Sequence, residues 1–552
     1  MSSVLRVGLA VGVLALLIAA VALGGADKAS QSSTTLVFAG AADPVVLDAA
    51  LISDGESFRV VYQITETLVG LKPGTTKLAP LLATGWKKSP NGRRWTFTLR
   101  RNVRFHDGTP FNAAAVCANF DRWYNFKGAQ QSSSASYYYN VTFGGFKTKN
   151  PGGALYKNCQ ARGSNVAVIN LKRPYGPFVS AMTLTPFAIQ SPTSMRENDA
   201  DKGRLTSDGV YQPLGKYGVP GGVTAGTGPF KLDSWRIGDK LELERNDDYW
   251  GRKAGLTRLI FRAIPDNAAR LQALQTGEID GYDLVEPQDI RTLRKDSDLK
   301  VLDREAFNVG YVGINQKVKP FDNVLVRRAL AHGLDRAGVV RSFYAGRGVV
   351  AKEFMPPNVP GYSNSVPQYP YNPARARALL QQAGVELPVE VEFWWPADIS
   401  RPYMPNPKNN FQAFAASLNK SGFKVVAKSA PWNPTYLGRV DAGTAGALHM
   451  IGWTGDYADA TSFLESILRS YKQFGLPLKN PLYTLLDRGL LETDPDARNG
   501  IYRQANNYIM RQVIGVPYVH TRPALAFKRN VVGYKPSPTT SESFASVRKT
   551  GS

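Results

Sequence analysis

The stretch Gly226-Thr227-Gly228-Pro229-Phe230 leads into the alternating apolar and charged residues of 240–245, and it opens a strand-rich block in mid-chain. Its glycines lack the third glycine of a dinucleotide-binding loop, and strand-like sequence follows where a nucleotide site needs a helix N-terminus. Because glycine adopts backbone angles that other residues avoid, we interpret the stretch as a hinge or tight turn where the chain crosses between lobes.

Helices and strands alternate on both sides of this stretch. A strand at 35–39 precedes a helix at 56–69, whose apolar residues recur at helical spacing. A helix at 267–275 ends before Gly277. Further on, we expect a strand at 309–315, a helix that begins with Asp322 as its N-cap, and a helix at 373–383 closed by Gly384. The pattern predicts an α/β protein.

The part between about 77 and 223 is richer in strands. Trp95, Phe97 and Leu99 alternate with polar residues, which is typical of a strand with one buried face. The stretch 132–150 is rich in Ser, Tyr and Gly and has weak periodicity, so we expect a surface loop there.

An export signal begins the chain. Arg6 precedes an uncharged apolar run at 7–25, and no Cys follows to carry a lipid. About 19 apolar residues is long for a cleaved signal and just enough to span a membrane. Residues 1–30 are therefore expected to be a signal peptide or an N-terminal anchor with a linker. The remainder is expected in the periplasm or on the outer face of the cytoplasmic membrane.

Cys117 and Cys159 are the only cysteines. An exported chain meets an oxidising compartment, which favours one disulfide worth about 2–4 kcal/mol. Two buried free thiols are the alternative. Neither the cysteine spacing nor the four scattered histidines predicts a metal site.

The net charge of +23 is large, and a basic surface usually attracts an anionic partner. The Lys and Arg residues are dispersed, without a basic arm, an RNA-binding aromatic signature or zinc-finger spacing. We expect no nucleic-acid partner, and we interpret the charge as solubility plus attraction to an anionic cell envelope.

Catalytic motifs are missing from the sequence. It has no nucleophile elbow, no phosphate-binding loop and no His-Glu-x-x-His motif. We therefore expect no catalysis and no cofactor. A secreted hydrolase with unfamiliar catalytic groups remains an alternative.

The richest aromatic and polar segment is Gly452-Trp453-Thr454-Gly455-Asp456-Tyr457-Ala458-Asp459. Trp and Tyr side chains supply flat apolar walls, and a shielded carboxylate beside them attracts an ammonium group. The structural alternative is a helix N-cap at Asp456 or Asp459, with Trp453 in the core.

A second cluster is Phe393-Trp394-Trp395-Pro396, followed by Arg401-Pro402-Tyr403. An Arg beside proline lies on a rigid loop, and its planar guanidinium can hold a carboxylate at two points. The alternative is a solvated surface Arg. An Asp and an Arg on loops of one lobe could hold the two ends of a zwitterion, which suggests a peptide ligand.

Further short motifs are spread along the chain: Leu78-Ala79-Pro80-Leu81-Leu82-Ala83, Phe105-His106-Asp107-Gly108-Thr109-Pro110-Phe111, Gln275-Thr276-Gly277-Glu278-Ile279-Asp280, Val326-Arg327-Arg328-Ala329-Leu330 and Tyr371-Asn372-Pro373. Together with 226–230 and 452–459, and in this order, they resemble the family-5 solute-binding proteins of ABC importers. That group includes the dipeptide- and oligopeptide-binding proteins.

The resemblance implies a two-lobed, periplasmic-binding-protein-like (venus flytrap) α/β fold with an extra inserted domain. Lobe I would combine 31–76, 224–305 and 516–552, the inserted domain would be 77–223, and lobe III would be 306–515. The resemblance also implies a monomer that closes on a small ligand and docks on membrane permease subunits.

The resemblance assigns the peptide amino terminus to Asp456 and the carboxyl terminus to Arg401. Trp453 would shape a side-chain pocket, and Tyr457 and Trp395 would also line the site. Met404 stands where the family pattern has a polar residue, which leaves ligand length open. Because the family also binds nickel complexes, haem, opines and sugars, a non-peptide solute is the alternative ligand.

Overall fold

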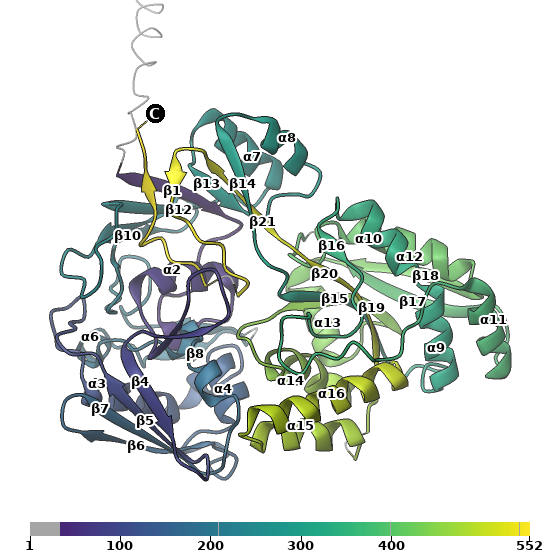
Figure 1. Cartoon of the computed structure of the whole chain (residues 1–552), viewed down its shortest axis with the longest axis horizontal. Helices are drawn as coiled ribbons and strands as arrows, with labels where there is room; N and C mark the ends of the chain where they lie inside the picture. Colours follow the sequence, from purple (N-terminus) through teal and green to yellow (C-terminus); the bar gives the residue numbers. More distant parts are fainter. Residues whose placement is uncertain (1–33, 208, 398, 478, 540, 552) are drawn as a thin grey trace, which may run out of the picture.

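The computed structural model describes residues 34–551 except 208, 398, 478 and 540. The predicted signal or anchor at 1–30 lies outside these residues. The described part is built around sheets of seven, six and four strands, which we call the seven-, six- and four-stranded units. Figure 1 shows the six-stranded unit on one side and the other two stacked on the opposite side. No helix within the described residues is long and apolar enough to cross a membrane.

The seven-stranded sheet takes its strands from three separate parts of the chain. Its order is β10 (Phe230–Arg236), β11 (Lys240–Arg245), β12 (Arg258–Ala263), β1 (Thr35–Gly40), β13 (Gly281–Asp283), β21 (Ala524–Lys528) and β14 (Leu299–Asp303). Strand β1 is parallel to β12 and β13, so these three strands end at one edge. Leu36 and Phe38 pack in one buried cluster, while Val37 and Ala39 pack in another. Successive residues of a strand face opposite sides, so both faces of this sheet are buried.

Helices cover both faces of the seven-stranded sheet. One face carries α2 (Gly55–Ile64), and the other carries α7 (Asn267–Thr276) and α8 (Ile290–Lys295). Helix α2 starts where Asp54 accepts hydrogen bonds from the backbone N–H groups of Glu56 and Ser57. Helix α7 ends at Gly277, whose φ of 85° lies in the left-handed region.

The six-stranded sheet is ordered β16 (Gly348–Val349), β20 (Gly515–Thr521), β15 (Asn308–Ile314), β19 (Leu448–Thr454), β17 (Val389–Pro396) and β18 (Phe423–Ala430). One face packs on α9 (Val324–Gly333), α10 (Arg336–Phe343), α11 (Pro373–Gln382) and α12 (Pro407–Asn419). The other packs on α13 (Leu437–Ala442), α14 (Thr461–Leu468), α15 (Pro481–Leu491) and α16 (Pro495–Gln512).

The four-stranded sheet is ordered β4 (Ala83–Lys88), β5 (Arg94–Leu99), β7 (Val166–Leu171) and β6 (Tyr156–Arg162). With it lie α3 (Ala113–Tyr124), α4 (Tyr137–Phe143), α5 (Phe178–Ala181) and α6 (Pro192–Glu197). Small two-stranded sheets pair β2 (Val69–Leu71) with β3 (Leu78–Pro80), β8 (Gly203–Leu205) with β9 (Tyr211–Pro213), and β22 (Val531–Val532) with β23 (Arg548–Lys549). A disulfide joins Cys117 of α3 to Cys159 of β6, with 5.1 Å between their Cα atoms.

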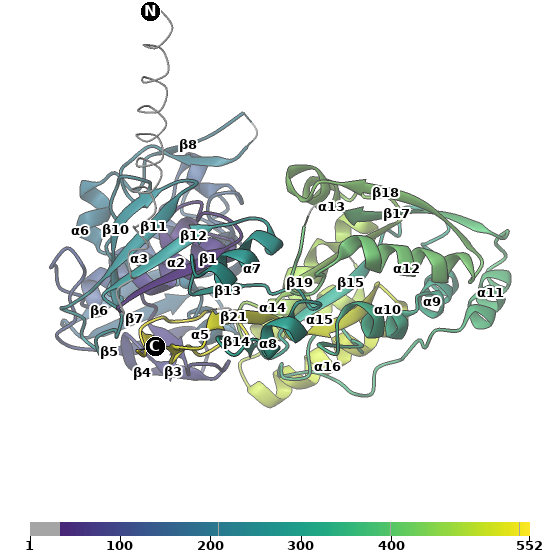
Figure 2. The same cartoon turned by 90° about the horizontal axis from the view of Figure 1, so that it is seen from above.

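The chain crosses between the two larger sheets at 304–307 and at 522–523 (Figure 2). The second crossing comes later than the boundary expected at 516, because β20 pairs with β15 and β16 in the six-stranded sheet. Gly226 and Gly228 do not lie at either crossing. They lie against the end of α2, where a Cβ on Gly226 would come within 2.1 Å of the Ile64 carbonyl oxygen. Close packing of two backbones explains these glycines.

The surface loop expected at 132–150 is wrong in part. It contains helix α4, and Tyr138, Tyr139 and Phe143 of that helix are buried. Tyr139 stacks on Phe143 with ring centroids 4.9 Å apart and on Phe146 at 5.0 Å. Aromatic packing against the rest of the unit stabilises a segment whose periodicity is weak.

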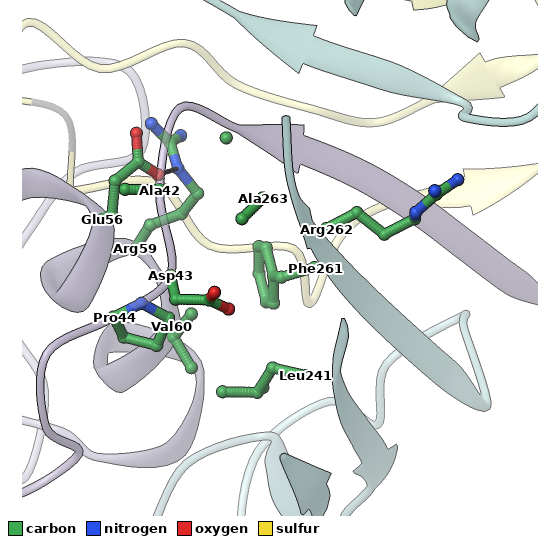
Figure 3. Close-up of a pocket in the computed structure, with 11 residues that line it drawn as sticks. Ala42, Asp43, Pro44, Glu56, Arg59, Val60, Leu241, Phe261, Arg262 and Ala263 are labelled. Carbon is green, nitrogen blue, oxygen red and sulfur yellow. Dashed lines mark hydrogen bonds and ion pairs between the residues drawn. The ribbon is translucent and has the colours of Figure 1, made fainter. Parts of the chain in front are cut away.

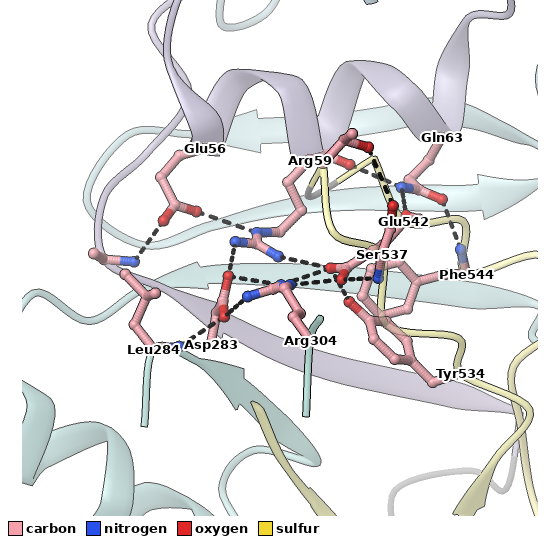
Figure 4. Close-up of polar contacts among 12 residues, drawn as sticks. Glu56, Arg59, Gln63, Asp283, Leu284, Arg304, Tyr534, Ser537, Glu542 and Phe544 are labelled. Carbon is pink, nitrogen blue, oxygen red and sulfur yellow. Dashed lines mark hydrogen bonds and ion pairs between the residues drawn. The ribbon is translucent and has the colours of Figure 1, made fainter. Parts of the chain in front are cut away.

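A buried network of charged side chains lies where the chain crosses between the sheets (Figure 4). Arg304, at the first crossing, donates from its backbone N–H to the Pro523 carbonyl of the second at 2.9 Å. Its guanidinium lies between two carboxylates, donating to Asp283 at 2.5 and 3.0 Å and to Glu542 at 2.7 Å from two nitrogens. Arg59 of α2 also contacts Asp283. The network ties the C-terminal segment, α2 and the crossings together.

Candidate functional site

Two loops that carry predicted site residues leave the six-stranded sheet at the same edge. Strands β17 and β19 are parallel neighbours, with Phe393 beside Leu448 and Trp394 beside His449. The loop after β17 carries Arg401, and the loop after β19 carries Asp456. In open α/β sheets, ligands bind outside the carboxyl ends of the strands, so this edge is the expected place for a site.

Tyr403, in the loop after β17, lies against strand β19. A Cβ on Gly452 of β19 would lie 2.3 Å from Cδ2 of Tyr403, so glycine at this position lets the Tyr403 ring rest on the strand. The backbone groups of Arg401 and Met404 pair with each other, at 3.1 and 2.9 Å. Thr521 donates to the Pro402 carbonyl at 2.6 Å, which fixes the loop to the end of β20.

Asp456 is half-buried and has no cationic partner within 4.0 Å among the residues that the structure describes. Burial raises the pKa of its carboxyl to about 7, while a hydrogen bond from Tyr138 opposes that rise. Its backbone N–H donates to the Ser462 hydroxyl at 2.7 Å. A desolvated carboxylate without a countercharge attracts a cationic group strongly.

The neighbouring acid, Asp459, has a different surrounding. It accepts from the backbone N–H of Thr461, the first residue of α14, at 2.9 Å. It is also paired with Arg498 of α16, whose second nitrogen lies 2.6 Å away. The N-cap of α14 is Ala460, so neither acid has the cap position considered for this segment, and Asp459 instead stabilises the first turn and pairs with Arg498.

Tyr138 was not predicted from the sequence, because its segment was expected to be a loop. Its hydroxyl donates to Oδ1 of Asp456 at 2.8 Å, across the interface between the four-stranded and six-stranded units. Its ring packs against Phe58 of α2, with centroids 5.6 Å apart. The helical spacing of Tyr139 and Phe143 was the one signal in the sequence that could have indicated a packed helix here.

The four-stranded unit touches the six-stranded unit again beyond Tyr138. The backbone N–H of Gly176 donates to the Leu490 carbonyl at 2.8 Å. Lys88 donates to the Thr493 carbonyl at 2.9 Å. These contacts join the four-stranded unit to the end of α15 and to the turn before α16.

Arg401 is half-buried, and its Nε atom is buried without a hydrogen-bond partner in the part of the chain that the structure describes. The guanidinium carbon lies 4.7 Å from the centroid of the Trp432 ring, which is a cation–π contact. No carboxylate of the described residues lies within 4.0 Å of it. The Arg401 guanidinium therefore has no ion-pair partner among the described residues, and its charge is opposite in sign to that of the Asp456 carboxylate.

The three predicted aromatic residues lie in different surroundings. Trp453 is partly buried beside the α14–α16 face, and its Nε1 atom is buried with no partner among the described residues. Tyr457 is 8% exposed and packs in the cluster that includes the four-stranded unit. Trp395 stacks on Phe411 of α12 at 5.7 Å. Of the three, only Trp453 has a buried polar atom without a partner in the part of the chain that the structure describes.

A second concave surface lies in the seven-stranded unit, where β1 and β12 end (Figure 3). Three of its four charged side chains are in ion pairs. Glu56 contacts Arg59 at 3.3 Å, and Arg262 contacts Glu278 at 3.4 Å. Asp43 makes no ion pair with another described residue and accepts from the backbone N–H of Gly238 at 2.8 Å. Among the described residues, this surface therefore does not combine unpaired charges of both signs, as Asp456 and Arg401 do.

Metal ligands do not gather in the described part of the chain, where no group of three His, Cys, Asp or Glu could hold an ion. His449 is buried against Phe474, with ring centroids 4.9 Å apart, and burial lowers its pKa to about 3. Such a histidine is a neutral packing residue.

Comparisons with known proteins agree with this architecture. The model for bacterial extracellular solute-binding proteins, family 5, matches residues 77–475. The dipeptide-binding protein of Escherichia coli K12 is 27% identical over 536 residues, covering 94% of this chain and 95% of that protein. Heme-binding protein A of Haemophilus influenzae is 29% identical over 542 residues, covering 95% of this chain and 94% of that protein.

A solved structure shares the fold. It is the ABC transporter-associated periplasmic binding protein DppA from Helicobacter pylori, in complex with the peptide STSA. The TM-score is 0.76 at 28% identity, covering 93% of this chain and 98% of that chain. This match confirms the predicted periplasmic-binding-protein-like α/β fold. The chain belongs to family 5 of the bacterial extracellular solute-binding proteins, whose members bind solutes and are not enzymes.

Proposed function

We propose that this protein captures di- or oligopeptides outside the cytoplasm and delivers them to the membrane subunits of an ABC importer. One observation carries the proposal. Asp456 and Arg401 are unpaired opposite charges on two loops at one edge of the six-stranded sheet, and a zwitterion can neutralise both. Asp456 would bind the amino terminus and Arg401 the carboxyl terminus of the ligand.

The remaining site residues would complete the pocket. Trp453 would shape a side-chain pocket, and the Trp432 ring lies against the Arg401 guanidinium. Tyr457 and Trp395 would act indirectly, by holding the two loops against the neighbouring cores. The relatives named for dipeptides and the solved complex with STSA support a peptide as the ligand.

Ligand capture would depend on movement at the two crossings. We infer that the seven- and four-stranded units move together as one lobe and that the six-stranded unit is the other lobe, with 304–307 and 522–523 as the hinge. A ligand that contacts both lobes shifts the protein toward its closed form, which the permease would recognise. The chain would act as a monomer on the outer side of the membrane, where its basic surface favours an anionic envelope.

Calorimetry on the purified protein tests the proposal. Asp456→Ala and Arg401→Ala should each weaken binding of a dipeptide at least about tenfold, because each leaves a desolvated ligand charge unpaired. Arg375→Ala, which changes an exposed arginine on α11, should bind as the wild type does. Unchanged affinity in both site variants would exclude the assignment.

The ligand class needs its own experiment, since one relative is named for heme. Thermal-shift screening should include di- to pentapeptides, heme, sugars and metal complexes. Stabilisation by a non-peptide solute alone would replace the peptide in this proposal. Recovery of an unaltered peptide after long incubation would agree with binding without hydrolysis.

A further inference from the structure

A pocket at the hinge adjoins Arg401. Its walls come from both sides of the crossings: the loop after β13, the end of α10, the Arg401 loop and the segment 521–524. It is partly open to solvent. Asp456 does not line it. The pocket therefore extends the proposed site at the Arg401 end.

The pocket is lined by three arginines, Arg347, Arg401 and Arg522, and by no acidic residue. Arg347 is 8% exposed and contacts Asp303 at 2.9 Å. Asp303 is shared with Arg294, at 3.3 Å, so it does not fully neutralise Arg347. Within the described residues, neither Arg401 nor Arg522 makes an ion pair. The side chains that line the pocket thus carry an excess of positive charge, and the nearby Glu286, which contacts Ser400, offsets part of it.

The Arg522 side chain lies at the pocket mouth, where the chain crosses between the units. It is exposed, and its guanidinium donates weakly to the Gly346 carbonyl at 3.4 Å. Its own carbonyl accepts from two nitrogens of Arg347, at 2.9 and 2.6 Å. The backbone of this crossing is therefore fixed, while the Arg522 side chain remains free to reach a ligand.

Leu284, which lines the pocket, and Ala345, which follows the wall residue Tyr344, have uncommon backbone conformations. Leu284 has φ 57° and Ala345 has φ 47°, both in the left-handed region that non-glycine residues rarely adopt. The Leu284 N–H is held by the side chain of Asp283, at 2.7 Å. Such conformations cost of order 1–3 kcal/mol and concentrate at ligand sites.

We propose that this hinge pocket is an anion subsite, so that the protein prefers ligands with a second negative charge next to the carboxylate held by Arg401. For a peptide, this means an acidic C-terminal residue. The inference rests on the proposed function, because it takes Arg401 as the residue for the carboxyl terminus. The apolar wall residues, such as Val285 and Pro523, suit the methylene groups of a Glu side chain.

Calorimetry with the matched dipeptides Ala-Glu and Ala-Gln tests the inference, since the two differ mainly in one charge. The wild-type protein should bind Ala-Glu about fivefold more tightly, as expected for a partly exposed ion pair. High salt should reduce this ratio. The same ratio is then measured for Arg522→Gln.

Arg522→Gln should lower the ratio about threefold, while Arg252→Gln, an exposed arginine outside the pocket, should keep the wild-type ratio. If Ala-Glu and Ala-Gln bind the wild type equally, the anion subsite is excluded and the proposed peptide function stands. If neither peptide binds, both proposals fail. The affinity ratio of the wild type at low and high salt tests the inference even if the variant is unstable. A preference for Ala-Glu that salt does not reduce would not come from charge, and it would exclude the anion subsite.

Discussion

The hydroxyl of Tyr138 donates a 2.8 Å hydrogen bond to Oδ1 of Asp456, and so joins the four-stranded unit to the six-stranded unit. Burial raises the pKa of the Asp456 carboxyl to about 7, and this hydrogen bond limits the rise. Because this hydrogen bond spans the two units, the contact between them is linked to the ionisation of the Asp456 carboxyl.

Tyr138→Phe should move the pH dependence of ligand binding upward. The variant removes the donor that stabilises the carboxylate, so the pKa of Asp456 should rise further above 7. An ammonium group needs the ionised form, so peptide affinity should increase with pH through about 7 in the wild type and through a higher pH in the variant. Calorimetry at pH values on both sides of 7 measures the midpoint.

Tyr139→Phe is the matched control for this experiment. It changes the next residue of α4, whose hydroxyl has no hydrogen-bond partner among the described residues. Its binding midpoint should equal that of the wild type. An equal midpoint in Tyr138→Phe would show that the Tyr138 contact does not influence Asp456.

Replacement of Arg304 should destabilise the protein severely. Arg304→Met leaves Asp283 and Glu542 buried without this cation, and breaking a buried pair in this way costs about 3–5 kcal/mol. Arg236→Gln, which breaks an exposed pair with Asp239, should cost less than about 1 kcal/mol. Urea denaturation of both variants gives the two free energies of unfolding. Similar losses in the two variants would contradict a stabilising role for the buried network at the two crossings.

The sequence predicted local structure well where the decisive contacts are local. The helix expected at 267–275 appears as α7, and the helix expected at 373–383 appears as α11, because caps and turns are encoded by neighbouring residues. The N-cap expected at Asp322 was wrong by one position, since Asn323 caps α9. Two adjacent residues with cap-forming side chains cannot be ranked without the backbone geometry.

Long-range contacts could not be predicted in the same way. Tyr138 and Asp456 are 318 residues apart, and no periodicity links a tyrosine-rich segment to a distant aspartate. The second crossing depends on the pairing of β20 with β15, which also joins segments far apart in the sequence. Asp456 and Arg401 were proposed as site residues because their types and neighbours resemble a family pattern, whereas the pocket lined by Arg347, Arg401 and Arg522 has no sequence pattern of its own.

Loss of the disulfide should lower stability without removing the ligand site. Cys117 and Cys159 close a loop of 42 residues within the four-stranded unit, which predicts a loss of about 2–4 kcal/mol in Cys117→Ala/Cys159→Ala. Thermal unfolding with and without reductant measures the effect. Reductant should lower the melting temperature of the wild type and leave the double variant unchanged, and a wild type insensitive to reductant would contradict the prediction.

Glu353 should make stability fall as the pH rises. Its side chain is fully buried, Oε1 accepts from the backbone N–H of Ser363 at 3.2 Å, and Oε2 has no partner among the described residues. Burial raises the pKa of this carboxyl to about 9 from its ordinary 4.5. The folded protein therefore keeps a proton that the unfolded chain releases above 4.5. The associated stability is complete below 4.5 and is lost as the pH rises toward 9.

Glu353→Gln removes this titration while keeping a side chain of similar shape. Relative to the wild type, the variant should gain up to about 1.4 kcal/mol per pH unit across this window, and show little difference in acid. Denaturant titrations near pH 5 and near pH 8 measure the change. Glu390→Gln, in an exposed pair with Lys424, should show no such pH dependence. If the wild type and Glu353→Gln keep a constant difference at both pH values, Glu353 has the same charge in the folded and unfolded protein between them, and burial does not raise its pKa.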